Sequence, residues 1–223
     1  FEFDAENPEV PADCDVLLVA GPEVDMASSE YVAIERYVAE GGDAIFMLDN
    51  GQAMGVARWV ENFGVQMDND LIIEVEQSGY ELTSEGLRPV TTYNLGVRMI
   101  PKEHEVAEGL VEEGQAARIY AIESRSVQLA ESMPESLTGE IIAESAPNTW
   151  AEQNPDYDNL EGAGIQEGIE QEGPVPMAAI VEGDFSAALD IPSATDAPEA
   201  TVVVFGDSDF PTDRTYGRSY GVN

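Results

Sequence analysis

A strand–helix–strand pattern near the start of the chain places the strongest limit on how this sequence can fold. Residues 15–20 form a short apolar run that closes on a Gly-Pro turn, which is typical of a buried strand. Residues 28–40 then carry apolar side chains at helical spacing, and Asp25 or Ser28 is expected to cap this helix. A second apolar run covers 44–48, so the unit predicts a right-handed parallel crossover.

The rest of the sequence adds short apolar runs between stretches of turn residues. We predict a second helix and further strands, at residues 52–63, 71–75, 119–130, 139–144, 177–182 and 201–205. The predicted fold class is therefore α/β, with a mostly parallel sheet, helices on both of its faces, and antiparallel additions from the middle and late strands.

The length of 223 residues fits one domain over residues 1–223. Within it, residues 76–175 are expected to form an irregular insertion or subdomain, because much of this region lacks sustained periodicity. Residues 145–175 are expected to be a long surface excursion. Trp150, which lies in it, is predicted to pack in a loop or to contact a partner.

The charge balance is extreme, with 45 Asp and Glu residues against 9 Lys and Arg residues and a net charge of −36. Self-repulsion at this charge destabilises a compact state, and salt near 1 M screens it over roughly 3 Å. We interpret the composition as adaptation to high salt, with an acidic face for a cationic partner as the alternative. Nucleic acid is not an expected partner, because no basic patch is present to neutralise phosphates.

The sharpest polar feature follows the last apolar run, where Gly206 leads into Asp207, Ser208 and Asp209. Asp49 and Asn50 end the second apolar run, so they are expected at the same carboxyl edge of the sheet, where open α/β sheets bind ligands. These five polar residues are the candidate ligand-binding residues. Carboxylate and amide oxygens suit Ca²⁺ or Mg²⁺, but chance clusters are expected in so acidic a chain, and no metal site is predicted.

No catalytic residue is predicted. A Gly-Asp-Ser turn resembles the nucleophile block of lipase-like hydrolases, yet serine chemistry needs a general base, and the only histidine, His104, lies upstream of Ser208, the reverse of the hydrolase order. The single cysteine, Cys14, precedes the first strand in a sequence with few cations to activate it. The chain also lacks a phosphate loop and a dinucleotide fingerprint, so no cofactor is predicted.

Several blocks of the sequence, in their order, resemble the auxiliary domain of ABC-type uncharacterized transport systems, a family related to gliding-motility transporter components. His104 begins a stretch similar to the family's His-Pro-Ile-x-x-Gly-Leu, with Glu105 and Val106 in place of Pro and Ile. The other blocks are residues 15–22, 37–42 with 44–49, 144–145 with 148–152, and 202–210.

This resemblance implies a non-catalytic, extracytoplasmic auxiliary or binding domain, cut from a longer protein that transmembrane helices anchor, with a membrane span expected beyond Asn223. It also implies a class I glutamine amidotransferase-like or flavodoxin-like fold without a Cys-His-Glu triad, and an ABC transporter membrane subunit as partner. The ligand and the oligomeric state stay open.

The sequence leaves two alternatives to this function open. The first is a hydrolase of the amidotransferase-like superfamily, degenerate or active, which requires Asp49, His104 and Asp207 to converge at the carboxyl edge of the sheet. The second is a structural interaction module whose acidic residues serve solvation alone.

Overall fold

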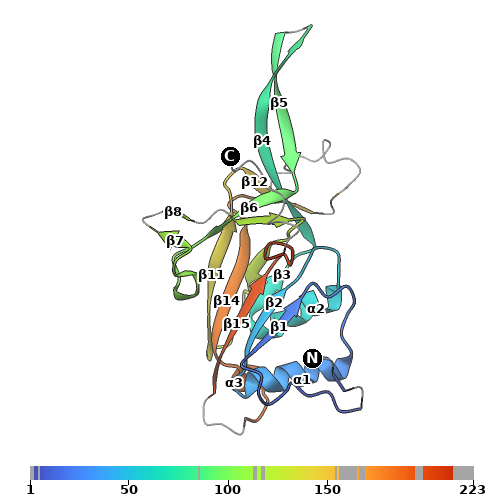
Figure 1. Cartoon of the computed structure of the whole chain (residues 1–223), viewed down its shortest axis with the longest axis vertical. Coiled ribbons are helices and arrows are strands. Elements are labelled where there is room, and N and C mark those ends of the chain that lie inside the picture. The colour runs from blue at the N-terminus through green and yellow to red at the C-terminus, as the bar shows by residue number, and fades with distance from the viewer. Residues whose placement is uncertain are drawn as a thin grey trace.

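A seven-stranded mixed sheet forms the body of the protein in this computed structural model (Figure 1). The structure describes residues 3–4, 6–84, 86–112, 115–116, 119–153, 155, 165, 169–193 and 198–212. In spatial order the strands are β1 (Val16–Ala20), β2 (Asp43–Met47), β15 (Glu199–Phe205), β14 (Pro176–Asp184), β11 (Leu137–Ser145), β6 (Gly96–Pro101) and β9 (Ile119–Ile122).

The predicted crossover is confirmed, since β1 and β2 pair in parallel and α1 (Ser28–Ala39) connects them. The expected caps of this helix are not used. Ala27 occupies the N-cap position, and its N–H donates to the Glu30 carboxylate at 2.7 Å. Asp25 instead accepts the Gly55 N–H at 2.6 Å, at the start of α2 (Met54–Trp59).

The predicted fold class is wrong beyond this unit. Only the β1–β2 and β2–β15 pairings of the main sheet are parallel, and the other four are antiparallel. The protein is mostly β, and its helices do not cover both faces of the sheet. They pack on one face, whereas strands cover the opposite face where the sheet curls, so the amidotransferase-like or flavodoxin-like layering does not form.

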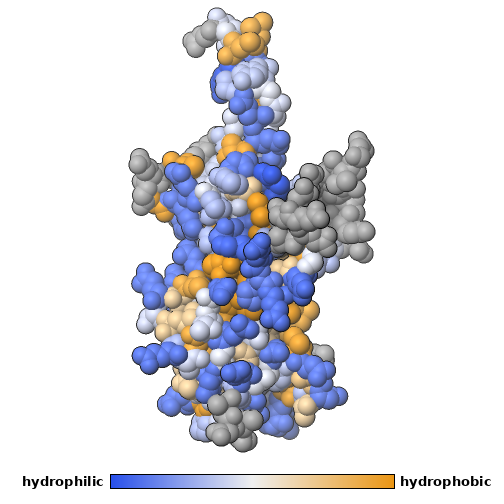
Figure 2. Space-filling model, turned by 90° about the vertical axis from the view of Figure 1, so that its left-hand side faces the viewer, coloured by the Kyte–Doolittle hydropathy of each residue, from blue (hydrophilic) through white to orange (hydrophobic). Residues whose placement is uncertain are grey.

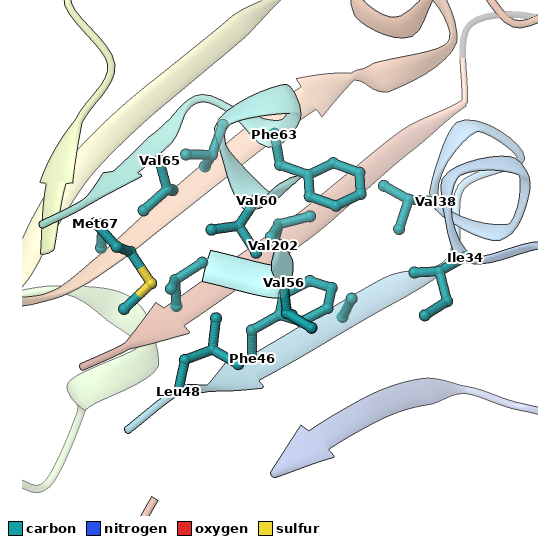
Figure 3. Packing of buried hydrophobic residues seen from close by; sticks show 14 of the residues in the cluster. Ile34, Val38, Phe46, Leu48, Val56, Val60, Phe63, Val65, Met67 and Val202 are labelled. Carbon is teal, nitrogen blue, oxygen red and sulfur yellow. The ribbon is translucent and has the colours of Figure 1, made fainter. Parts of the chain in front are cut away.

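The helical face carries the larger core (Figure 3). Phe46 of β2 stacks on Phe63 at a centroid distance of 5.8 Å, and Trp59 meets Phe63 edge to face at 4.9 Å. Phe63 belongs to η1 (Val60–Phe63), a short 3-10 turn after α2, and also touches Phe185 of α3 (Phe185–Leu189). Full burial of each such side chain contributes roughly 1.5–3 kcal/mol, so this aromatic cluster fixes the helices on the sheet.

A second core lies on the other face and joins the main sheet to a four-stranded sheet. That sheet contains β13 (Gln171–Glu172), β12 (Thr149–Gln153), β4 (Asp70–Thr83) and β5 (Gly86–Asn94). Ile72 of β4 and Ala151 of β12 pack against Met177 and Ile180 of β14. Strands therefore occupy the layer in which the sequence predicted helices.

The region expected to form an irregular insertion or subdomain, residues 76–175, contains regular strands. Strands β4 and β5 form a long hairpin that projects from the body, and β6 enters the main sheet (Figure 1). The surface excursion predicted at 145–175 contains β12, whose Trp150 is only 2% exposed and is not in a loop. Most residues between 154 and 168 lie outside the described part of the chain.

The remaining elements are short. They are β3 (Val65–Met67), β10 (Val127–Leu129), η2 (Glu105–Ala107), β7 (Val111–Glu112) and β8 (Gln115–Ala116). Strands β3 and β10 pair with each other, as do β7 and β8. Across the described ranges, no helix is long and apolar enough to span a membrane.

Candidate functional site

The candidate residues lie at the carboxyl ends of β2 and β15, which are adjacent parallel strands. The structure brings two of them into direct contact, as their positions after neighbouring strands predict. The Asp49 carboxylate accepts the Ser208 N–H at 2.6 Å through Oδ1 and the Ser208 hydroxyl at 2.7 Å through Oδ2. Both oxygens of Asp49 therefore bind the turn that follows β15.

Gly21, at the end of β1, completes this edge. It adopts φ +55°, and a Cβ atom built there would lie 2.7 Å from the Ser208 Oγ and 3.6 Å from the Asp49 Oδ2. Its N–H donates to the Met47 carbonyl at 2.9 Å. The ends of the three parallel strands are thus packed closely, and a residue with a side chain at position 21 would be strained.

Asp207 is buried, with only 2% of its surface exposed. One carboxylate oxygen accepts the Ile122 N–H at 2.8 Å and the other accepts the Phe210 N–H at 2.7 Å. Burial raises the pKa of Asp207 to about 7, the two N–H donors oppose this rise, and Asp49 adds to it. Asn50 and Asp209 are half-buried beside these residues.

The structure adds a residue to this edge that the sequence did not single out. Arg125 is fully buried, and its Nε donates to the Asp68 carbonyl at 2.7 Å, while Nη1 lies 3.5 Å from the Asp49 carbonyl. Its main-chain N–H donates to the Gly206 carbonyl at 2.9 Å. Burial lowers the pKa of Arg125, and the negative charges of Asp70 and Asp68 raise it.

The residues on either side of Arg125 bind β4. The Ser126 N–H and hydroxyl both donate to the Asp70 carboxylate, at 2.8 and 2.6 Å, and the Ser124 carbonyl accepts the Ile72 N–H at 2.9 Å. Burial raises the pKa of Asp70, although its bonds to Ser126 oppose this. The segment 124–126 therefore ties β4 to the turn after β15.

His104 does not join this cluster. Its Nδ1 accepts the Val106 N–H at 3.2 Å and so caps η2, beyond the Pro101 end of β6. Asp207 instead bonds to Ile122, which pairs with Gly96 at the other end of β6. A strand of six residues spans about 17 Å, which exceeds hydrogen-bond reach, so the Asp49, His104 and Asp207 constellation does not form.

The hydrogen bonds at this site are those of a structural turn. Ser208 donates its proton to a carboxylate, and the oxygens of Asp49 and Asp207 already accept hydrogen bonds from within the chain. Among the residues that the structure describes, no group of three His, Cys, Asp or Glu side chains is placed to bind a metal ion. The site thus fixes the ends of strands through hydrogen bonds within the chain.

A groove of about 540 Å³ lies at the opposite edge, near the amino end of β2. Cys14, Arg36 and Tyr37 are among its lining residues. The Tyr37 hydroxyl lies 3.2 Å from the Asp43 carbonyl and 3.4 Å from the Cys14 carbonyl. Burial raises the pKa of Tyr37. Its hydroxyl links α1 to the segment before β1, at Cys14, and to the start of β2, at Asp43.

Comparison with known proteins identifies relatives at the level of family and of fold. A family model described as "ABC-type uncharacterized transport system" matches residues 1–221. No curated protein matches the chain.

Two solved structures are similar at low identity. The N-terminal domain of mmIFT52 is 12% identical over 92% of this chain and 70% of that chain, with a TM-score of 0.54. A ThuA-like protein from Bacteroides uniformis ATCC 8492 is 12% identical over 87% and 60% of the two chains, with a TM-score of 0.36. The first likeness shows a shared fold and nothing about activity.

The buried Asp207 carboxyl makes stability depend on pH. It stays protonated in the folded protein at pH values where it ionises in the unfolded chain, near 3.9. Its contribution to the free energy of unfolding is thus fully present below pH 4 and is lost as the pH rises to about 7. Between pH 4 and 7, the free energy of unfolding of the wild type should therefore fall as the pH rises. We predict that Asp207→Asn makes this fall shallower by up to about 1.4 kcal/mol per pH unit.

Urea unfolding at a series of pH values measures this slope. Asparagine retains one acceptor oxygen, so the variant is less stable overall, and the slope is the informative quantity. Asp13→Asn, at an exposed aspartate, serves as the matched control and should keep the wild-type slope. Equal slopes for wild type and Asp207→Asn would show that Asp207 is ionised in the folded protein across this range.

Proposed function

Because this chain belongs to the ABC-type uncharacterized transport system family, we propose that it is a non-catalytic auxiliary domain on the extracytoplasmic side of such a transporter. The observation that carries the proposal is the extent of the match, which covers residues 1–221. The candidate site supports it, since Asp49 and Asp207 bind backbone groups of their own chain. We propose that residues 1–223 act as one domain of a longer, membrane-anchored protein, and that its partner is the transporter's membrane subunit.

The five candidate residues have a supporting role in this proposal. Asp49, Asp207 and Ser208 fix the carboxyl edge of the sheet, and Asn50 and Asp209 lie beside them, half-buried. A small ligand that binds this edge would meet the five candidate residues. Such binding is part of the proposal and concerns a ligand whose chemistry the site does not define.

The proposal predicts association with a transporter. The full-length gene product, expressed in its own host with an affinity tag and extracted in mild detergent, should co-purify with the membrane subunit of an ABC transporter. A tagged acidic soluble protein from the same host, of similar size, controls for non-specific recovery. A full-length product found in the soluble cytosolic fraction without transporter subunits would contradict the proposal.

We further propose that the protein works at high salt. The net charge of −36 and the single lysine, Lys102, support this, because self-repulsion among surface carboxylates is weak only when salt screens it. Only three ion pairs are found within the described residues, including Arg98 with Glu74 at 2.6 Å and Lys102 with Glu144 at 2.7 Å. Among the described residues, therefore, few carboxylates are neutralised by ion pairs within the chain.

Salt should accordingly raise the melting temperature. We predict an increase of about 10 °C or more between 0.1 and 2 M KCl, since a domain of this size shifts by roughly 2–4 °C for each kcal/mol. Differential scanning fluorimetry in KCl and in NaCl measures it, and sucrose at matched osmolality is the control for excluded-solute effects. A melting temperature that stays constant across the salt series would contradict adaptation to high salt.

A further inference from the structure

The turn after β2 contains the only Asn-Gly dipeptide of the sequence, Asn50-Gly51. The backbone nitrogen of the residue after an asparagine can attack the asparagine side chain, and a side chain on that residue hinders the attack. Glycine has no side chain, whereas every other asparagine that has a successor in this sequence precedes a residue with one. By sequence, Asn50 is therefore the asparagine most open to this reaction.

The structure leaves the Gly51 nitrogen accessible. Gly51 is exposed, and a Cβ atom built on it meets no heavy atom within 4 Å. Its φ of +71° lies in the left-handed region, which glycine adopts without strain. Within the described part of the chain, no acceptor binds the Gly51 N–H. The attacking group therefore has no hydrogen bond that must break before it reacts.

The strand before the turn keeps Asn50 in place beside this nitrogen. The Leu48 N–H still donates to the Phe205 carbonyl at 3.0 Å, so the main chain is held until just before the turn. Asn50 is half-buried, and its amide nitrogen is buried. Ring closure requires rotation about the Cα–C bond of Asn50. Gly51 and Gln52 can follow this rotation without displacing packed side chains, because both are exposed.

We propose that Asn50 is a site of spontaneous modification, at which the protein converts its own asparagine to aspartate and isoaspartate. The Gly51 nitrogen loses its proton and bonds to the Asn50 Cγ, the bond between Cγ and Nδ2 breaks, and the side-chain nitrogen leaves as ammonia. Water then opens the cyclic imide at either of its carbonyls. The net change is the gain of water and the loss of ammonia, so the reaction needs no oxidant or reductant.

The modification changes the candidate site itself, because Asn50 is one of its five residues. An amide donates and accepts hydrogen bonds, whereas a carboxylate only accepts them. The new charge follows Asp49, whose carboxylate binds the N–H and the hydroxyl of Ser208. Figure 2 shows a surface that is already largely hydrophilic, so the added charge acts through its position. The charge of this edge thus depends on the age of the protein, and this inference does not depend on the proposed function.

Peptide mapping of the full-length gene product tests this proposal. The folded protein is incubated at several pH values and digested, and mass spectrometry follows the peptide that contains Asn50. This peptide should gain the mass difference between NH2 and OH and separate into an aspartate and an isoaspartate product. The rate should rise with pH, because the Gly51 nitrogen must lose its proton. Asn62, an exposed asparagine that precedes Phe63, is the control in the same digest and should stay unchanged.

Two variants assign the reaction to this dipeptide. Asn50→Gln keeps the amide on a longer side chain, so the mass gain at position 50 should disappear. Gly51→Ala adds the hindering side chain and should slow the gain about tenfold in urea, where folding has no effect, which corresponds to about 1.4 kcal/mol in the activation barrier.

Urea-unfolded wild type, in which Asn50 should react, is the positive control. A folded protein that keeps Asn50 intact while the unfolded protein reacts would overturn the proposal. So would a mass gain at Asn62 as fast as that at Asn50, or equal rates for wild type and Gly51→Ala in urea.

Discussion

The buried guanidinium of Arg125 is the interaction on which the rest of the structure depends. Its side chain donates to the Asp68 carbonyl just before β4, and its main-chain N–H binds the Gly206 carbonyl just after β15. A side chain at Gly206 would collide with the Arg125 carbonyl, so the two segments are in direct contact. Arg125 thus fixes the point where the curled main sheet meets the four-stranded sheet, in a chain with few positive charges to spare.

This arrangement explains why the acidic edge of the sheet is a structural feature. Backbone N–H groups and the hydroxyls of Ser126 and Ser208 donate to Asp49, Asp70 and Asp207, so these carboxylates hold strands and turns of the chain together. Most of the other acidic residues that the structure describes are exposed, and the proposal that the protein works at high salt rests on them.

The sequence predicted the parallel crossover of β1, α1 and β2, because apolar periodicity and Gly-Pro punctuation act locally. It also placed Asp49 beside the turn containing Ser208, since both follow adjacent strands. It could not predict the β4–β5 hairpin, because the extra residue at Ser78 breaks the alternation that identifies a strand. The covering layer was misassigned to helices, because pairing of β12 with β4 depends on residues far apart in the chain. The sequence did not single out Arg125, because no local pattern distinguishes a buried arginine from an exposed one.

The stability of Arg125→Met tests most directly whether this residue organises the fold. Methionine matches much of the apolar volume but cannot donate, so buried carbonyls including that of Asp68 lose their partner, at about 1–3 kcal/mol for each unsatisfied group. Urea unfolding should show a loss of about 3 kcal/mol or more relative to wild type, whereas Arg58→Met, at an exposed arginine of α2, should stay within about 0.5 kcal/mol. Equal stability of the two variants would contradict the central role assigned to Arg125.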